Sequence, residues 1–466
     1  MNNDVAAKLK AAVGPKGFTE DPAEIAPHLE EWRSKYKGRA TLLLRPATTA
    51  EVSAIMSICN ESGTPVVPQA GNTGLVGAQI PFENEVLLSL SRLNRIRALN
   101  VEDSSMIAEA GVVLAAAQNA ADHNGLMLPL SLAAEGSCTI GGTLSTNAGG
   151  VNVLRYGMAR EQVLGLEAVL ADGRVLDLLR TLRKDNTGYD LKQLFIGAEG
   201  TLGIVTAAAL KLFPKPAMRC TAFLAVPSVK AAVALLARLQ AATGGLVNAF
   251  EILPRIGLEL VLAHIPQTSN PFGAPSPWYV LAEVSGIAAL KEVFETALEA
   301  ALSDGLASDA VIAASEAQRA ALWKLRESMS EAQKKEGPSL KHDVSVPVAA
   351  VADFIAKASA AVAAVLPGAR PVPFGHLGDG NIHFNIQAKD ADMASFLARW
   401  DEIARIVHDV VRDFGGSFSA EHGIGVMKRA DLKRYKSSVE VDLMRALKRT
   451  LDPQNILNPG KLVPDP

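Results

Sequence analysis

The sequence predicts an α+β protein made of two or three packed units. The chain has 466 residues, and a compact domain usually holds about 100–200. Short apolar runs separated by few helices fill the first half, whereas strand-like and helix-like segments alternate after Pro216. Pro214 and Pro216 therefore mark an expected domain boundary at the end of the first half.

The first half begins with a polar, helical-looking arm, followed by a helix with clear end signals. Thr48 and Glu51 form a capping box in front of apolar residues at helical spacing, and Gly63 ends the helix. Asp172 and Gly173, the preferred dipeptide of a type I′ turn, predict a hairpin between two later strands. The strands expected in this half cover residues 65–68, 86–90, 106–113, 163–170, 174–179 and 205–213.

The second half alternates strands with helices, which predicts one sheet covered on one face by helices. Residues 452–466 contain several prolines and no periodicity, so we expect this tail to lie on the surface or to cross another domain. The strands are expected at residues 220–226, 246–252, 278–284 and 309–313, and the helices at 228–242, 255–263, 288–302 and 316–335.

The charge balance excludes some classes of partner. Lys and Arg number 46 and Asp and Glu 49, so the net charge is 46 − 49 = −3, and the pI is near 6.3. This balance excludes a strongly basic nucleic-acid-binding surface, although it allows a local basic pocket. Hydrophobic residues at 48% predict a large core and exclude wholesale disorder.

Cysteine usage and the N-terminus predict the compartment. Cys59, Cys138 and Cys220 lie far apart without a CxxC pair, which argues against a disulfide framework or a thiolate zinc site. The N-terminus lacks the apolar core of a signal peptide, and no apolar stretch reaches the ~18 uninterrupted residues of a membrane span. We therefore expect a cytoplasmic protein without an integral membrane segment.

Three glycine-rich segments, at residues 68–77, 135–150 and 197–206, stand out in the first half. Glycine lets successive backbone N–H groups point into one concavity, which suits a pyrophosphate. Neither GxGxxG nor a P-loop occurs, so a Rossmann dinucleotide fold and an NTPase are disfavoured. One such segment alone favours an ordinary turn, but three together predict a long ligand cradled along its backbone.

These segments resemble the flavin-binding domain of the vanillyl-alcohol-oxidase/para-cresol-methylhydroxylase superfamily, in its D-2-hydroxyacid dehydrogenase branch. The resemblance runs from about Gly38 to the Asn458–Lys461 tail and implies a two-part FAD-binding domain of PCMH type. It also implies an inserted α+β cap domain and a C-terminal segment that returns to the flavin. The implied boundaries are an N-terminal arm 1–37, an FAD-binding domain 38–216, a substrate-binding cap 217–420 and a C-terminal segment 421–466.

The resemblance also implies which residues bind FAD. Members that attach the flavin covalently carry His where this chain has Asn72, so we expect a dissociable FAD. The implied FAD-binding residues are Pro68, Gln69, Ala70, Gly71, Asn72, Thr73, Gly74, Leu75, Gly136, Ser137, Thr139, Gly142, Ser145, Asn147, Gly149, Glu199, Gly200, Gly203, Ile204, Val205 and Asn458.

A cluster of histidines in the last third predicts a metal site. His376 and His383 flank a Gly-Asp-Gly-Asn turn that can bring both imidazoles to one point, and the Glu421-His422 pair offers a third ligand. His, His and Glu with an open position is a frequent catalytic zinc set. We interpret His28, His123, His264 and His408 as structural.

The resemblance assigns roles within this cluster. It implies that His376, His383 and Glu421 bind Zn²⁺ or a similar divalent ion. It also implies that His422 is the general base and that Asn385 reaches the substrate.

A possible carboxylate clamp lies before this cluster. Arg326 and Ser330 are neighbours at i and i+4 of a predicted helix, and Lys341 follows on a strand-like segment. Spacing alone favours ordinary surface charge, because acidic and basic residues flank them. The resemblance instead implies that these residues bind the distal carboxylate of 2-hydroxyglutarate, with Ser330 where the family usually has Thr.

The implied reaction is oxidation of D-2-hydroxyglutarate to 2-oxoglutarate, with hydride passing from C2 to flavin N5 and the proton to His422. Three alternatives stay open: the same chemistry on D-lactate, D-malate or a hydrophobic D-2-hydroxyacid, a zinc hydrolase, and a non-catalytic flavin-binding regulator. The reduced flavin would need an acceptor, an electron-transfer protein or a quinone, which the sequence does not identify. A homodimer is expected only from the frequency of symmetric dimers.

Overall fold

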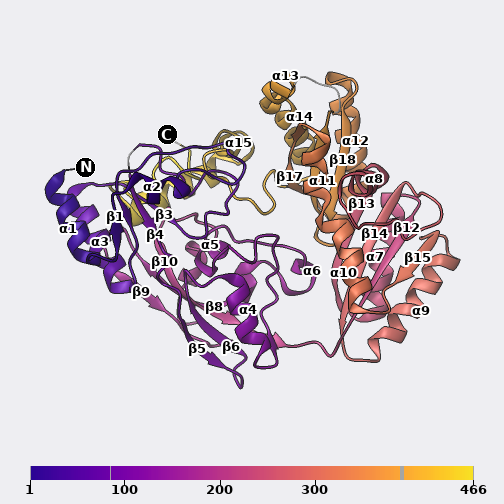
Figure 1. The fold of residues 1–466 in the computed structure, drawn as a ribbon, viewed down its shortest axis with the longest axis horizontal. Helices are drawn as coiled ribbons and strands as arrows, with labels where there is room; N and C mark the ends of the chain where they lie inside the picture. The colour runs from indigo at the N-terminus through magenta and orange to yellow at the C-terminus, as the bar shows by residue number, and fades with distance from the viewer. Residues whose placement is uncertain (1, 84, 389–392, 465–466) are drawn as a thin grey trace. The chain divides into compact units, whose positions relative to one another are not determined.

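The computed structural model describes residues 2–83, 85–388 and 393–464, and its chain divides into two compact units. Unit 1 comprises Met1–Gly150, Gly157–Lys215 and Glu421–Pro466, and unit 2 comprises Val151–Tyr156 and Pro216–Ala420. The chain thus leaves unit 1 after Lys215 and re-enters it at Glu421. Within unit 1, the yellow C-terminal segment lies among the indigo elements of the N-terminus (Figure 1).

Unit 1 contains two main sheets and a short two-stranded one. The first sheet has the order β1 (Phe18–Thr19), β2 (Leu43–Leu44), β4 (Val86–Ser89) and β3 (Val66–Gln69), with β2, β4 and β3 parallel. The second is antiparallel, in the order β5 (Ile96–Asn100), β6 (Ser105–Glu109), β10 (Ile204–Lys211), β8 (Val163–Val169) and β9 (Val175–Leu178). The short sheet pairs β11 (Phe213–Pro214) with β7 (Leu126–Met127).

The helices of unit 1 are mostly short, as the first half of the sequence predicts. The α-helices are α1 (Asn3–Val13), α2 (Pro22–Ile25), α3 (Thr49–Ser62), α4 (Leu114–Asp122), α5 (Ile140–Ser145), α15 (Arg429–Tyr435) and α16 (Ser438–Leu451). The 3-10 helices are η1 (Ala26–His28), η2 (Ala159–Gln162) and η3 (Leu191–Leu194).

Helix α3 begins and ends where its sequence signals predict. The Thr48 side chain accepts the Glu51 N–H at 3.1 Å, and Gly63 ends the helix at φ 64°. The capping box is incomplete, because the Glu51 carboxylate accepts the N–H of Ala47 rather than that of Thr48. The apolar face of the helix is fully buried against the first sheet.

The predicted hairpin forms between β8 and β9, but its turn type differs from the prediction. The Gly173 N–H donates to the Leu170 carbonyl at 3.0 Å, and the Leu170 N–H donates to the Arg174 carbonyl at 2.9 Å. Within this turn only Gly173 has a positive φ, of 85°, whereas a type I′ turn needs positive φ at both central residues. The loop therefore has three residues and the glycine occupies its left-handed position.

Unit 2 is built on one large sheet of predominantly antiparallel strands. Its order is β15 (Asp309–Ile312), β12 (Met218–Val226), β14 (Trp278–Gly286), β13 (Val247–Pro254), β18 (Arg370–His376), β19 (Asn381–Gln387) and β16 (Ser339–Leu340), with β17 (Asp343–Ser345) also paired to β19. The helices are α6 (Val153–Tyr156), α7 (Val229–Thr243), α8 (Arg255–His264), α9 (Leu290–Ser303), α10 (Glu316–Glu327), α11 (Met329–Glu336), α12 (Val351–Val365), α13 (Met393–Ala398) and α14 (Trp400–Asp413), with 3-10 turns η4 (Val348–Ala350) and η5 (Leu377–Asp379).

Helices cover both faces of this sheet, so the prediction of one covered face is wrong. Leu224 on β12 packs into a core cluster with residues of α7, α9, α12 and α14. The next residues in the alternation, Phe223 and Ala225, pack into a second cluster with residues of α8, α10 and α11. From Ala222 to Val226 every side chain of β12 is apolar and buried, which is typical of a strand covered on both faces.

The helix predicted over residues 316–335 is broken at Ser328. Ser328 has φ −76° and ψ −3°, and its N–H donates to the carbonyls of Lys324 and Arg326. The break separates α10 from α11, so Arg326 and Ser330 lie on different helices. The single helix expected to carry both residues is therefore wrong.

One described segment, Val348–Val365, is long and apolar enough to cross a membrane by length and composition. Its helix α12 contributes Phe354, Ala358 and Val362 to the core of unit 2. Its polar residues form ion pairs, Asp353 with Lys230 at 3.2 Å and Lys357 with Asp413 at 2.8 Å. One face of α12 thus packs into the core of unit 2, and its charged residues form ion pairs with neighbouring helices.

Helix α9 offers a matched test of core packing in unit 2. Leu298 is 2% exposed and Leu302 is 37% exposed on the same helix. Leu298→Ala should lower the free energy of unfolding by about 2–5 kcal/mol, because it leaves a cavity in the core. Leu302→Ala should change it by no more than about 0.5 kcal/mol. Urea unfolding followed by circular dichroism measures both, and equal effects would contradict the packing described here.

Candidate active site

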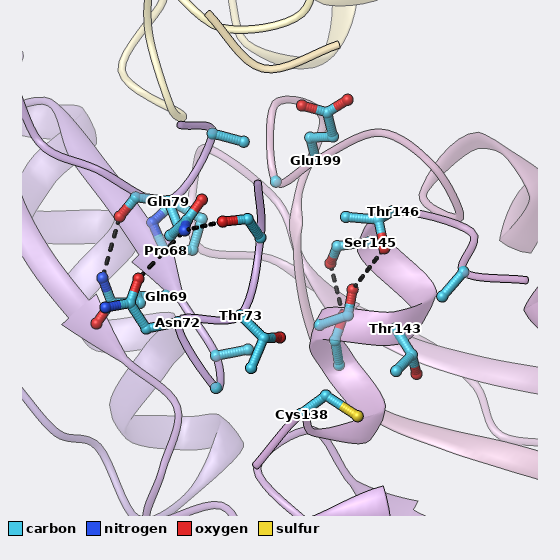
Figure 2. A pocket seen from close by; sticks show the side chains of 18 of the residues that line it. Pro68, Gln69, Asn72, Thr73, Gln79, Cys138, Thr143, Ser145, Thr146 and Glu199 are labelled. Carbon is cyan, nitrogen blue, oxygen red and sulfur yellow. Dashed lines mark hydrogen bonds between the residues drawn. The ribbon is translucent and has the colours of Figure 1, made fainter. Parts of the chain in front are cut away.

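A cavity of about 270 Å³ lies within unit 1, where the three glycine-rich segments and the C-terminal segment meet. In Figure 2, Gln69, Asn72 and Gln79 lie on one side, Thr143, Ser145 and Thr146 on the other, and Glu199 beyond them. Of the residues expected to bind FAD, the lining includes Pro68, Gln69, Ala70, Gly71, Asn72, Thr73, Gly74, Leu75, Gly142, Ser145, Gly149, Glu199, Gly200, Gly203, Ile204, Val205 and Asn458.

Four residues of the expected set, Gly136, Ser137, Thr139 and Asn147, are not part of this lining. Asn147 turns its side chain to the backbone of the next segment, because its Oδ1 accepts the Arg160 N–H at 2.9 Å. Thr139 is the N-cap residue of α5 and is buried. Composition identifies the donor-rich segment, but it does not determine which way each residue faces.

Several lining residues carry no sequence signal. Gln79 is one: its Nε2 donates to Asn72 Oδ1 at 3.2 Å and to the Gly74 carbonyl at 2.8 Å, and so braces the first segment. The other unpredicted members are mostly small or apolar: Val76, Ala78, Leu90, Leu132, Ala133, Ala134, Cys138, Gly141, Thr143, Thr146 and Ala148. Glu421 and His422, predicted for other roles, also line this cavity.

Close approach explains two of the glycines. A Cβ on Gly71 would lie 2.2 Å from the Ser137 carbonyl oxygen, so the first segment packs directly on the second. A Cβ on Gly200, whose φ is 72°, would lie 2.5 Å from Pro68 Cγ, so the third segment packs on the first. Larger residues at either position would force the segments apart.

The first segment also provides unused backbone donors. Within the described residues, the N–H groups of residues 71–75 donate to no acceptor, although these residues are half-buried. A run of such donors fits an anionic group, because each N–H can satisfy one phosphate oxygen. The described lining contains no Lys or Arg, so an anion held here would be bound by backbone dipoles. The donor set therefore fits the pyrophosphate of a dinucleotide.

The side chain of Gln69 is engaged behind this segment. Its Nε2 donates to the carbonyls of His28 at 2.9 Å and Gln79 at 3.1 Å, and its Oε1 lies 2.5 Å from His28 Nδ1. Asn72, in the left-handed region at φ 53°, donates to the carbonyls of Pro27 and Glu30. Both side chains thus hold the loop against residues 27–30, and His28 has the structural role expected of it.

The returning C-terminal segment is anchored by Glu199. Its carboxylate accepts the N–H of Ile424 at 2.6 Å and the N–H of Gly425 at 2.7 Å. A Cβ on Gly423 would lie 2.6 Å from the same carboxylate, so only glycine permits this approach. Burial raises the pKa of Glu199 to about 7, although the two N–H groups act to lower it.

Two further contacts fix the start and the end of this segment. Glu421 Oε1 accepts the Gly150 N–H at 2.7 Å. Asn458, with φ 43°, donates through Nδ2 to the carbonyls of Glu199 at 2.8 Å and Ala78 at 3.0 Å. The residue expected to be the general base, His422, is thereby held at the cavity of unit 1.

The two predicted histidine ligands lie together in unit 2. His376 ends β18 and His383 lies on β19, opposite Phe374, and their ring centroids are 5.6 Å apart. The turn between the strands reverses the chain at η5 and at Gly380, whose φ is 81°. His376 is opposite Asn381, and Asn381 and His383 are two residues apart on one strand, so the two histidines are diagonal neighbours on the same face.

His376 and Arg326 share one buried carboxylate. Glu251 on β13 is 1% exposed, and its Oε1 lies 2.7 Å from His376 Nδ1 while its Oε2 accepts Arg326 Nε at 2.7 Å. Burial alone would raise the pKa of Glu251, but the contacts with His376 and Arg326 outweigh it and lower that pKa to about 2. No sequence signal identified Glu251, which lies in an apolar strand.

The other predicted substrate-binding residues are placed differently. Asn385 is buried on β19, and its Nδ2 donates to Gln333 Oε1 at 2.9 Å. Lys341 is half-buried between β16 and β17, and Ser330 is exposed on α11. His408 is buried on α14 with its ring 5.7 Å from that of Phe418, in the structural role expected of it.

Comparison with known proteins identifies the class. A family described as "FAD binding domain" matches residues 40–179, and one described as "FAD linked oxidases, C-terminal domain" matches residues 215–462. The chain belongs to the FAD-linked oxidases. It is an FAD-dependent oxidoreductase, and the predicted fold class is confirmed.

Full-length relatives narrow the class. A "Probable D-2-hydroxyglutarate dehydrogenase, mitochondrial" of Oryza sativa subsp. japonica is 41% identical to this chain. The matched region covers 100% of this chain and 82% of the length of the rice protein. A "D-2-hydroxyglutarate dehydrogenase" of Xanthomonas citri pv. viticola is 39% identical over 97% of this chain and 96% of its own. The solved structure of p-cresol methylhydroxylase with substrate bound shares the fold, with a TM-score of 0.79 and 18% identity over 99% of this chain and 97% of that one.

The expected cytoplasmic location is wrong by this comparison. The matching proteins from plants and animals are described as mitochondrial, in conflict with that expectation. The prediction rested on unpaired cysteines and on the lack of a signal-peptide pattern. The first indicates a reducing environment and the second argues against secretion, but neither distinguishes one reducing compartment from another.

The glycine contacts predict how two matched variants will bind FAD. Gly200→Ala should weaken FAD binding at least about tenfold, because the new Cβ clashes with Pro68 and the φ of 72° strains any other residue. Gly136→Ala should leave binding within about twofold, because nothing lies within 4 Å of its Cβ position and it is outside the lining. Fluorescence titration of the flavin-free protein with FAD measures both, and equal losses would contradict this assignment.

The raised pKa of Glu199 predicts a pH-dependent contribution to stability. Its folded pKa of about 7 lies above the usual value, so the contribution is fully present below about pH 4.5 and is lost as the pH rises through 7. Relative to Glu199→Gln, which cannot ionise, the wild type should lose roughly 1–3 kcal/mol of unfolding free energy between pH 5 and 8. Urea unfolding of both proteins tests this, and a difference that does not change with pH would rule it out.

Proposed function

We propose that the protein oxidises D-2-hydroxyglutarate to 2-oxoglutarate with a dissociable FAD and a divalent metal ion. The full-length similarity to proteins named D-2-hydroxyglutarate dehydrogenase supports the substrate. The observation that carries the proposal is the arrangement in unit 2, where Glu251 joins a buried arginine to one of two facing histidines. A cation beside a guanidinium suits a substrate with two carboxylates.

The residues take defined roles in this proposal. FAD, when bound, supplies the acceptor for the two electrons that leave C2 of the substrate as hydride. His422 accepts the proton of the C2 hydroxyl as general base. His376, His383 and Glu421 would hold a Zn²⁺ or similar ion, which would supply positive charge at the hydroxyacid end of the substrate.

Other residues of unit 2 bind the distal carboxylate of the substrate and contact the substrate beside the metal. Arg326 and Lys341 bind the distal carboxylate through charge, and Ser330 adds a hydroxyl donor. Asn385, buried two residues after His383 on the same strand face, presents an amide to the substrate. Within the described residues, Nη1 and Nη2 of Arg326 donate to no acceptor, so Arg326 retains donors for a ligand although Glu251 binds its Nε.

A panel of D- and L-2-hydroxyacids mixed anaerobically with the flavin-loaded protein tests the reaction. D-2-hydroxyglutarate should bleach the flavin, L-2-hydroxyglutarate should not, and chelator treatment should abolish the bleaching until a divalent ion is restored. A colourless protein that needs only metal would support a hydrolase instead. A yellow protein that no hydroxyacid reduces would support a flavin-binding regulator.

Lys341→Met separates dicarboxylate from monocarboxylate substrates. It should raise the KM for D-2-hydroxyglutarate at least about tenfold, because a charged contact to the distal carboxylate is lost, and it should change the KM for D-lactate little. Lys335→Met, an exposed lysine on α11 paired with Glu331, is the matched control and should change neither. A preference for D-lactate that survives Lys341→Met would overturn the dicarboxylate assignment.

A further inference from the structure

Glu251 is a fully buried carboxylate in unit 2. It is 1% exposed on β13, among the apolar side chains of a strand buried over its whole length. A buried carboxylate is strongly unfavourable unless its oxygens are paired, because the ion loses its hydration on burial. Each oxygen is paired with a different residue, His376 through Oε1 and Arg326 through Oε2, both at 2.7 Å.

The contact with His376 determines which ring nitrogen is available. Nδ1 faces a carboxylate, which only accepts hydrogen bonds, so the neutral ring carries its proton on Nδ1. This tautomer leaves Nε2 as the ring nitrogen whose lone pair can serve as a metal ligand. A carboxylate behind a ligand histidine also orients the ring and increases its basicity.

The contact with Arg326 fixes the guanidinium in the same way. Arg326 Nε donates to Glu251, and the guanidinium carbon lies 5.0 Å from the centre of the Phe374 ring. Arg326 is only 8% exposed, and its two Nη groups have no acceptor within the described part of the chain. Glu251 holds one edge of the guanidinium and Phe374 lies against its face, so the two Nη groups point in a fixed direction toward any bound anion.

We propose that Glu251 is a positioning residue that couples the metal-binding histidine to the carboxylate-binding arginine. One carboxylate sets the tautomer of His376 and the orientation of Arg326, so neither end of the substrate site can be formed without it. This inference rests on the proposed function, which supplies the metal and the dicarboxylate. It adds that the two ends are linked by a single buried residue.

The test compares Glu251→Gln with Glu283→Gln in the flavin-loaded, metal-stripped protein. Glutamine keeps the size of the side chain but cannot accept from both partners. Glu283 is also buried, on the neighbouring strand β14, and bonds to Thr221 and Trp323 rather than to the site. Calorimetric titration with Zn²⁺ measures metal affinity without turnover, and steady-state kinetics measures the KM for D-2-hydroxyglutarate and for D-lactate.

Glu251→Gln should weaken Zn²⁺ binding by about 10–100-fold and raise the KM for D-2-hydroxyglutarate more than that for D-lactate. Glu283→Gln should lower the unfolding midpoint and leave both quantities unchanged. If Glu251→Gln does not fold, Glu251→Asp, which keeps the charge but shortens the reach, should show the same two losses in milder form.

Three outcomes would overturn the inference. If the wild type binds Zn²⁺ and oxidises D-2-hydroxyglutarate while Glu251→Gln matches it in both, Glu251 has no positioning role and the proposed function stands. If both variants lose Zn²⁺ affinity equally, the effect is general destabilisation. If the wild type binds no divalent ion, the metal of the proposed function fails, and this inference fails with it.

Discussion

The unused backbone donors of residues 71–75 are the constraint on which unit 1 depends. A half-buried run of N–H groups without protein acceptors is stable only if water or a ligand accepts from it. The described lining of the cavity contains no Lys or Arg, so the backbone itself must supply the attraction for an anion. The other two glycine-rich segments pack directly on this one, at Gly71 and at Gly200, and hold its conformation.

A buried glutamate positions the proposed functional residues in each unit. In unit 1, Glu199 accepts two backbone N–H groups and so fixes the segment that carries His422. In unit 2, Glu251 accepts from one cationic side chain and one imidazole, and so fixes Arg326 and His376. The partners explain the opposite pKa shifts: the two backbone N–H groups and the charge of Lys428 do not offset burial at Glu199, whereas Arg326 and His376 do so at Glu251.

Local patterns predicted local structure well. The ends of α3, the hairpin between β8 and β9 and the meeting of His376 with His383 all follow from short-range signals. Composition alone also grouped the glycine-rich segments, which line one cavity. These features depend on residues that are neighbours in the chain or across one turn, where spacing and glycine content carry the information.

Features set by distant contacts could not be predicted. The break at Ser328 and the helices on both faces of the large sheet depend on how unit 2 packs, and periodicity does not report on that. Glu251 looks like an isolated charge in a strand until His376, 125 residues later, is seen beside it. Asn147 lies in a donor-rich segment, but its side-chain oxygen accepts the backbone N–H of Arg160 instead of lining the cavity.

Hydrogen–deuterium exchange of the amides of residues 71–75, with and without FAD, tests the central claim most directly. These N–H groups donate to no described acceptor, so they should exchange quickly in the flavin-free protein and slow by at least about tenfold when FAD binds. The amides of residues 204–211 in β10, already paired in the sheet, provide the internal reference. If FAD binds and the protein turns yellow while residues 71–75 gain no protection, the backbone of this segment does not hold the cofactor and the account is wrong.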